Sequence, residues 1–103
     1  MSSLYIIIPA YNEAENIEKT ISDWYSVVES HNEEGNSRLV IINDGSKDNT
    51  YDLVCRLAKK HPLLVPLTKP NGGHGSTVLY GYRYAIQNHA DYIFQTDSDG
   101  QTN

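Results

Sequence analysis

The sequence is poor in cysteine, in basic clusters and in long apolar runs, and each shortage excludes a class of protein. The single cysteine among 103 residues, Cys55, cannot form an intramolecular disulfide and fits a reducing compartment. A formal net charge of −5 without a basic run argues against nucleic acid or an anionic membrane as the main partner. No apolar run reaches membrane-spanning length, and residues 6–8 are too few for a signal peptide. We therefore expect a cytoplasmic domain without a targeting segment.

Four short apolar runs alternate with three segments of helical periodicity. The runs cover residues 4–8, 38–43, 63–67 and a segment that begins at Tyr92. Continuous apolar runs of this length are typical of strands buried on both faces in a parallel sheet. The apolar faces of the three helices are Ile17, Ile21, Trp24 and Val28; Leu53, Val54, Leu57 and Ala58; and Val78, Leu79, Tyr82, Ala85 and Ile86. This order predicts an α/β fold in three layers, with a mostly parallel sheet, helices on both faces and right-handed crossovers.

Local signals mark the ends of several elements. Proline cannot donate to a sheet ladder, so Pro9 should close the first strand, and Pro66 places the third strand at an edge. Asn12 and Glu15 have the spacing of a capping box, which predicts the start of the first helix nearby. A chain of this length forms a single domain with a modest core.

Each predicted strand is followed by polar side chains of the kind that bind ligands. They are Tyr11 and Glu13 after the first strand, Asp44 and Ser46 after the second, the loop 69–76 after the third, and Asp97 and Asp99 after the fourth. In a parallel sheet these loops share one edge, where ligands bind in open α/β folds. Each side chain also has an ordinary structural interpretation, as a half-buried tyrosine, a helix-dipole partner or a turn residue.

Two carboxylates, Asp97 and Asp99, stand one residue apart directly before Gly100. Mg²⁺ and Mn²⁺ take oxygen ligands, and Mg²⁺ is commonly held by one or two carboxylates together with substrate phosphates. The pair therefore favours a metal-bridged phosphate ligand. A solvated Asp-Ser-Asp-Gly turn is the alternative.

The loop 69–76 is rich in glycine and leads into a helix. Its glycines allow close backbone approach, and the N–H groups at the start of the helix favour an anion. His74 could add positive charge or a hydrogen bond to a phosphate oxygen, or it could be a solvent-exposed loop histidine. A P-loop is excluded because no lysine separates Gly75 from Ser76. The dinucleotide fingerprint comes closer, although Val78 occupies its third glycine position, so an NAD- or FAD-binding segment stays open.

Four motifs in series resemble the family 2 glycosyltransferases, which have the GT-A fold. They are the segments 8–13 (IPAYNE), 43–46 (NDGS, with Asp48 and Thr50), 71–75 (NGGHG) and 97–101 (DSDGQ). Their order and spacing agree over essentially the whole chain, and the DSDGQ segment is most similar to the branch of dolichol- and polyprenyl-phosphate sugar synthases. Each motif alone is weak, but the series is specific. Residues 1–103 would then be the nucleotide-sugar-binding N-terminal part of a GT-A domain, with the acceptor half absent.

The resemblance implies a nucleotide-diphospho-sugar donor, UDP ahead of GDP, and Mg²⁺ or Mn²⁺ as cofactor. Pro9, Tyr11 and Glu13 would border the nucleoside, Asp44 would hydrogen-bond the base, and Gly73 and His74 would face the donor. Asp97 would contact the ribose or the metal, and Asp99 would be the principal metal ligand. Relatives often carry Lys or Arg in place of His74, and Asp in place of Asn43.

In this family the general base and the acceptor site lie further along the chain, beyond residue 103. Residues 1–103 alone would then bind donor without turnover, and the full-length protein could lie at the cytoplasmic face of a membrane. The acceptor, whether lipid phosphate, saccharide or another group, stays open. So do two rival functions, a non-catalytic nucleotide- or metal-binding module and a purely structural interaction domain. Cutting a sheet after its fourth strand would expose an edge and favour self-association.

Overall fold

The computed structural model describes residues 2–98, which form four parallel strands and three helices in strict alternation. The elements are β1 (Leu4–Ala10), α1 (Ile17–Ser30), β2 (Arg38–Asp44), α2 (Thr50–Ala58), β3 (Leu64–Lys69), α3 (His74–Gln87) and β4 (Tyr92–Gln95). The strand order in the sheet is β3-β2-β1-β4, and every pairing is parallel. The predicted α/β fold and the edge position of the strand with Pro66 are confirmed.

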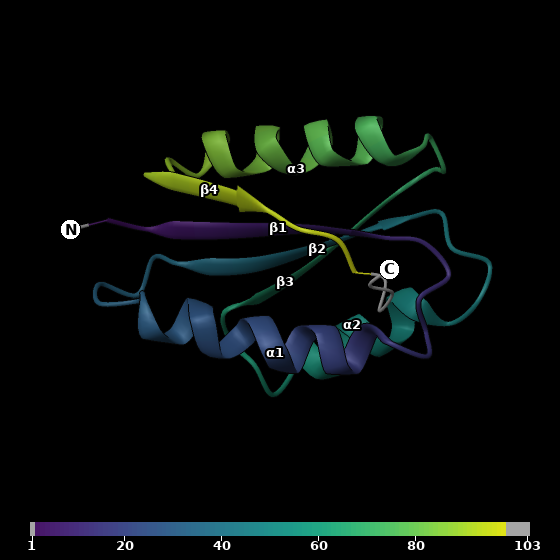
Figure 1. The fold of residues 1–103 in the computed structure, drawn as a ribbon, viewed down its shortest axis with the longest axis horizontal. Helices are drawn as coiled ribbons and strands as arrows, with labels where there is room; N and C mark the ends of the chain where they lie inside the picture. Colours follow the sequence, from purple (N-terminus) through teal and green to yellow (C-terminus); the bar gives the residue numbers. More distant parts are fainter. Residues whose placement is uncertain (1, 99–103) are drawn as a thin grey trace.

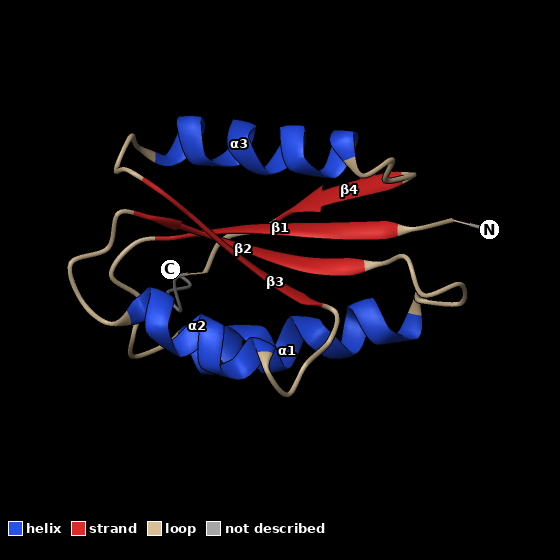
Figure 2. Ribbon diagram, turned by 180° about the vertical axis from the view of Figure 1, so that it is seen from behind, coloured by secondary structure: helices blue, strands red, loops and turns tan. Residues whose placement is uncertain are grey.

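The sheet lies between two helical layers. Helices α1 and α2 cover one face and α3 covers the other (Figure 1), and the view from behind shows the same three layers (Figure 2). Alternate residues of the central strands face opposite ways, so that Ile6 and Ile8 pack beneath α1 while Ile7 packs beneath α3. Both faces of the sheet are therefore buried, which explains the continuous apolar runs in the sequence.

Helix α3 approaches the sheet closely through small residues. Its buried residues are Thr77, Gly81 and Ala85, which follow one another at four-residue intervals. A Cβ on Gly81 would lie 2.3 Å from Cγ2 of Ile7. The predicted apolar face of this helix was therefore wrong in part, since Leu79 is 48% exposed and Ile86 is 64% exposed. The sequence pattern favoured large apolar residues, whereas close packing selected small ones.

The first strand continues through Pro9 to Ala10, so the expectation that proline would close it was wrong. Pro9 lies opposite Ile42 of β2 in the register. The carbonyl of Ile7 points toward β4, where it accepts from the N–H of Thr96 at 3.1 Å. Residues two apart on a strand point the same way, so the nitrogen of Pro9 also faces that side. Strand β4 has already ended at Gln95 there, and no ladder hydrogen bond is lost.

The expected capping box before the first helix does not form. Helix α1 begins at Ile17, and its N-cap, Asn16, makes no side-chain capping hydrogen bond. Asn12 instead has a positive φ of 53° and bonds to a different loop, as described below. On α1 itself the fully packed aromatic residue is Tyr25. Trp24 is only partly buried and contacts Phe94 of β4, with ring centroids 5.6 Å apart.

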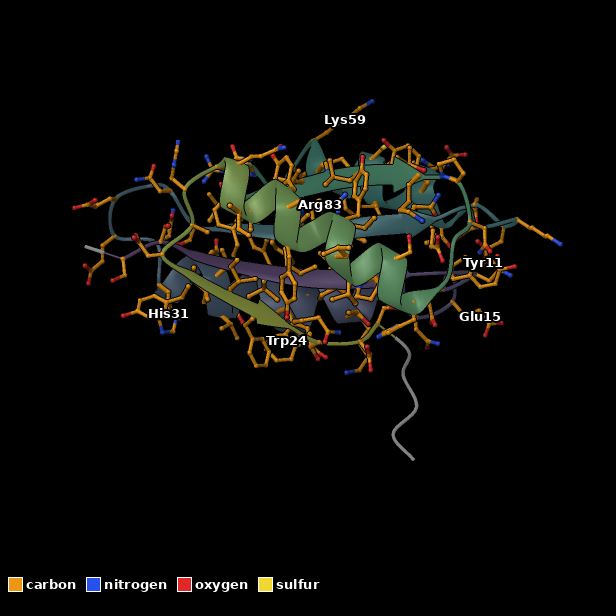
Figure 3. All side chains as sticks on the ribbon, turned by 90° about the horizontal axis from the view of Figure 1, so that it is seen from above. Tyr11, Glu15, Trp24, His31, Lys59 and Arg83 are labelled. Carbon is orange, nitrogen blue, oxygen red and sulfur yellow. The ribbon has the colours of Figure 1, made fainter. Side chains whose placement is uncertain are left out.

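Figure 3 views the molecule from the side of α3 and shows Trp24 beside β4, and Tyr11 beyond the end of β1. Cys55 is partly buried and makes no disulfide. Within residues 2–98, no helix combines the length and apolar character needed to cross a membrane.

Candidate functional site

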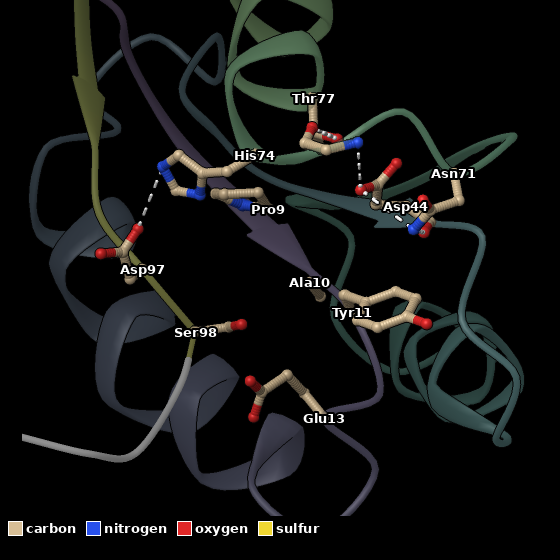
Figure 4. Close-up of a pocket in the computed structure, with 11 residues that line it drawn as sticks. Pro9, Ala10, Tyr11, Glu13, Asp44, Asn71, His74, Thr77, Asp97 and Ser98 are labelled. Carbon is tan, nitrogen blue, oxygen red and sulfur yellow. Dashed lines mark hydrogen bonds and ion pairs between the residues drawn. The ribbon is translucent and has the colours of Figure 1, made fainter.

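A pocket of about 350 Å³ opens at the carboxyl ends of the strands. Figure 4 shows its lining side chains, which come from the ends of all four strands and from the start of α3. The lining residues are Pro9, Ala10, Tyr11, Glu13, Asp44, Asn71, Gly73, His74, Thr77, Asp97 and Ser98. The strand order reverses at β1, between β2 and β4, and ligands of open α/β sheets bind at such a switch point. The prediction that the four loops share one crevice is confirmed.

Asp44, at the end of β2, organises the glycine-rich loop. Its Oδ1 accepts hydrogen bonds from the N–H of Gly72 at 2.9 Å and from Nζ of Lys69 at 3.0 Å, while its Oδ2 accepts from the N–H of Gly73 at 3.1 Å. The side chain of Asn71 donates to the main-chain carbonyl of Asp44 at 2.9 Å. The loop is thus fastened to the end of β2 before any ligand is present.

The carboxyl group of Asp44 is held in its ionised form. Burial opposes ionisation, but hydrogen bonds from Gly72 and Lys69, with the positive charge of Lys69, outweigh it and lower the pKa of Asp44 below its ordinary value. A buried anion with several donors is a rigid feature of the pocket wall. The sequence identified Asp44 as a site residue but gave no sign of Lys69 as its partner.

Tyr11 and Glu13 are positioned by hydrogen bonds between the loops that follow β1 and β2. The N–H of Asn12 donates to Oγ of Ser46 at 2.9 Å, and Oδ1 of Asn12 accepts from the N–H of Lys47 at 2.8 Å. The N–H of Glu13 donates to Oγ1 of Thr50 at 2.9 Å. These bonds order the neighbouring backbone, although the ring of Tyr11 itself remains 43% exposed. An exposed aromatic face beside a polar pocket is suited to stacking.

Asp48 extends the contact between these two loops. Its Oδ2 accepts from the N–H of Ala14 at 3.3 Å, and its Oδ1 accepts from the N–H and the hydroxyl of Thr50 at the start of α2. Burial disfavours the ionised form of Asp48, but the hydrogen bonds from Thr50 and Ala14 prevail and lower the pKa of its carboxyl group. Asp48 therefore connects the two loops as an anion.

His74 and Asp97 face each other across the pocket mouth, where a dashed line joins them in Figure 4. Nε2 of His74, the first residue of α3, lies 3.8 Å from Oδ1 of Asp97, and both side chains are more than half exposed. Oδ1 of Asp97 also accepts from Nε2 of Gln95 at 3.1 Å. Ser98 is buried, and its carbonyl accepts from Oγ1 of Thr20 on α1 at 3.1 Å. The chain after β4 is thereby directed past the pocket.

The second acidic residue of the proposed metal pair, Asp99, lies outside the described residues. Within residues 2–98 there is no group of three or more His, Cys, Asp or Glu side chains placed to hold a metal ion. Mg²⁺ bound to a nucleotide needs only one or two carboxylates, because phosphates and water supply its remaining ligands. Asp97 at the pocket mouth fits that type of site as one such carboxylate.

The dinucleotide fingerprint does not match the position that such folds use. In those folds the glycines lie in the turn after the first strand, close to the pyrophosphate. Here the corresponding turn reads Tyr11-Asn12-Glu13, and the glycines follow β3 instead. The loop glycines are engaged by Asp44, as described above.

The arrangement defines a Rossmann-like α/β domain with a polar ligand pocket at its strand ends. Residues 5–103 match the model of the glycosyl transferase family 2, and the chain belongs to that family, whose fold is of the GT-A type. The resemblance drawn from the four motifs is therefore confirmed.

Several curated proteins are similar to the chain over most of its length. A dolichyl-phosphate beta-glucosyltransferase of Trichomonas vaginalis (ALG5C) is 35% identical over 100 residues, which are 93% of this chain and 29% of that protein. A UDP-N-acetylglucosamine--dolichyl-phosphate N-acetylglucosaminyltransferase of Methanococcus voltae is 31% identical, with 95% of this chain and 41% of that protein covered. The chain thus spans less than half the length of these relatives.

Among solved structures, the Staphylococcus aureus protein TarS, residues 1–349, aligns with a TM-score of 0.69 over 94% of this chain and 27% of that one. The sequence identity is 18%, so this likeness concerns the fold alone.

Proposed function

We propose that this domain binds the nucleotide-diphospho-sugar donor of a family 2 glycosyltransferase, with residues 1–103 as the N-terminal, donor-binding part. The observation that carries the proposal is the pocket at the switch point of the sheet, which combines an exposed ring, Tyr11, with a fixed anion, Asp44. The start of α3 adds main-chain N–H groups beside Asp97, where a diphosphate and its metal would lie. These groups suit the base, the sugar and the phosphates of one nucleotide.

In this proposal each pocket residue has a role toward the donor. Pro9, Tyr11 and Glu13 border the nucleoside, and Asp44 accepts a hydrogen bond from the base. Gly73 and His74 face the diphosphate. Asp97 and Asp99 hold Mg²⁺ or Mn²⁺ or contact the ribose, and the metal would act as a Lewis acid that stabilises the departing nucleoside diphosphate. UDP is the expected nucleotide ahead of GDP.

We further propose that the whole protein transfers the sugar to a lipid phosphate of the dolichyl or polyprenyl type. Two relatives are dolichyl-phosphate glycosyltransferases by name, and an acceptor that is already an anion reduces the need for a general base. No residue of the described pocket is assigned as that base. Residues 1–103 should bind donor without catalysing transfer, and glycosyl transfer by this chain alone would contradict the assignment.

Calorimetric titration of UDP and GDP, each with and without Mn²⁺, tests the donor site. The wild type should bind UDP in a metal-dependent manner, and Asp99→Ala should weaken binding by one to two decades, or about 1–3 kcal/mol. Asp52→Ala, an exposed acidic residue on α2, is the matched control and should bind like the wild type. A folded wild type that binds neither nucleotide under any condition would contradict donor binding by this domain.

A further inference from the structure

Lys69 and Asp44 form a buried ion pair beside the pocket. They are the last residues of β3 and β2 and lie opposite each other in the register. Nζ of Lys69 is 3.0 Å from Oδ1 of Asp44, and the two side chains are only 11% and 7% exposed. Burying two charges is costly unless their geometry is good and their remaining bonds are made. A pair placed here therefore needs an explanation beyond general stability.

The surroundings are shaped to hold the ammonium group. Nζ of Lys69 donates a second hydrogen bond to the carbonyl of Pro70 at 2.8 Å. A Cβ on Gly72 would lie 2.9 Å from Nζ, so glycine at that position leaves room for the ammonium group without a shift of the lysine side chain. The glycine-rich loop therefore makes room for Lys69 and also donates hydrogen bonds to Asp44 from the N–H groups of Gly72 and Gly73.

The two oxygens of Asp44 consequently differ. Oδ1 accepts both the ammonium of Lys69 and the N–H of Gly72. Oδ2 accepts the N–H of Gly73, and its distance of 3.5 Å from Nδ2 of Asn71 is too long for a strong bond. A carboxylate oxygen has two lone pairs, so Oδ2 retains capacity for a ligand in the pocket that Asp44 lines.

We infer that Lys69 is a positioning residue for base selection: it fixes Asp44 as an anion with Oδ2 presented to the nucleotide base. This inference rests on the proposed function. A fixed carboxylate accepts but cannot donate, so it favours a base whose ring nitrogen carries a proton. Uracil at N3 and guanine at N1 are such bases, whereas N3 of cytosine is an acceptor. The same anion should therefore reject cytosine.

The variant Lys69→Met tests this assignment, because it keeps the apolar stem and removes the charge. Without the ammonium, Asp44 is freer to rotate and to take up a proton, after which it can serve a cytosine ring as donor. Calorimetry with UDP and CDP at equal Mn²⁺ concentration should show that the wild type binds UDP at least about tenfold more tightly than CDP. In the variant the two affinities should differ by no more than about threefold. Lys60→Met, an exposed lysine after α2, should keep the wild-type ratio.

The affinity ratio separates positioning from mere support of the fold, because general damage to the pocket weakens both nucleotides alike. A wild-type ratio preserved in Lys69→Met overturns the inference and leaves donor binding intact. A wild type that binds neither nucleotide overturns the proposed function and the inference together.

Should Lys69→Met fail to fold, the wild type supplies an independent measurement. The carboxyl carbon of Asp44, followed by ¹³C NMR, should titrate below the ordinary pKa of an aspartate, about 3.9. Titration at or above that value would show that Asp44 is not held as an anion, and would overturn the inference.

Discussion

The side chain of Asn12 accepts a hydrogen bond from the main-chain N–H of Lys47 across two loops that lie 35 residues apart in the sequence. Asn12 also has a positive φ of 53°, a conformation that asparagine tolerates better than most residues. The residue therefore serves both the local backbone and the contact between the loops after β1 and β2. Its hydrogen bond occupies the place that a capping interaction with Glu15 was expected to take.

Substitutions at Asn12 should separate these two contributions. Asn12→Gly keeps the positive φ and loses the hydrogen bond, so it should reduce the free energy of unfolding by about 1 kcal/mol. Asn12→Ala loses the bond and adds the strain of a positive φ, so it should cost about 1 kcal/mol more. Urea unfolding followed by circular dichroism measures both. Glu15→Ala should leave the free energy of unfolding nearly unchanged. If it lowered this free energy as much as Asn12→Gly does, the result would instead support the capping box.

A second prediction concerns the close approach of α3 to the sheet. Gly81→Ala should gain helix propensity of up to about 1 kcal/mol, but its Cβ would lie 2.3 Å from Ile7 and 2.8 Å from Ile42. Overpacking typically costs about 1–3 kcal/mol, and these contacts are severe, so we expect a net loss of stability. The matched control is Gly75→Ala on the same helix, where a Cβ would meet nothing within 4 Å.

Thermal unfolding of the two variants gives opposite expected shifts. Gly81→Ala should melt below the wild type, while Gly75→Ala should melt at the same temperature or slightly above it. A Gly81→Ala protein as stable as the wild type would show that α3 can move away from the sheet at little cost.

The overall architecture was predictable because strands that are buried on both faces of a sheet appear in the sequence as continuous apolar runs. The continuous run Ile6-Ile7-Ile8 predicts a central parallel strand, and polar residues at the strand ends predict the location of the pocket. The face of α3 was not predictable, because Thr77, Gly81 and Ala85 carry little apolar signal and are selected by distance to the sheet. The periodicity of a sequence reports where hydrophobic residues recur, whereas the contact of α3 with the sheet depends on residues with small side chains.

The roles of the site residues were predictable only as chemical types. Asp44 was identified by its place after a strand, but its partner Lys69 stands 25 residues away and looks like an ordinary polar residue at a strand end. The pairing depends on the register of β2 with β3, which a sequence does not state. Likewise, Pro9 continues its strand because β4 is short, a fact about another part of the chain.

A third prediction follows from the ionisation of Asp44. Burial opposes its charge, but hydrogen bonds and Lys69 lower its pKa in the folded protein, so folding favours the carboxylate. A group whose pKa is lowered by folding stabilises the folded state at pH values above its pKa in the unfolded chain, about 3.9. This contribution to the free energy of unfolding disappears as the pH falls through the pKa of the folded state. The wild type should therefore keep a constant Asp44 contribution from pH 7 to 5 and lose it below about pH 4.

The variant Asp44→Asn separates the pH-dependent contribution of Asp44 to the free energy of unfolding from the contributions of the other carboxylates. The substitution leaves the positive charge of Lys69 buried without its partner, and it should lower the free energy of unfolding by about 3 kcal/mol at pH 7. The difference in urea midpoint between wild type and variant should be constant down to pH 5 and narrow below pH 4. A difference that does not depend on pH would mean that the charge of Asp44 contributes nothing to folding.

A fourth prediction concerns the two edges of the sheet, which differ in their protection. Strand β3 carries Pro66, which discourages edge pairing, whereas β4 reads Tyr-Ile-Phe-Gln without charge or proline. Two residues of β4 itself are exposed, Phe94 by 48% and Tyr92 by 62%. The 103-residue chain should therefore self-associate through β4 as its concentration rises, which size-exclusion chromatography with light scattering would detect.

Charge placed on this edge should suppress the association. Phe94→Lys introduces a charge at the exposed edge and removes the contact with Trp24, so it should shift the chain toward the monomer at equal concentration. Tyr80→Lys changes an aromatic residue of α3 that is 40% exposed, and it should leave the association unchanged. Equal suppression by both variants would indicate a general effect of added charge. A wild type that stays monomeric throughout would show that the short edge is too small to pair.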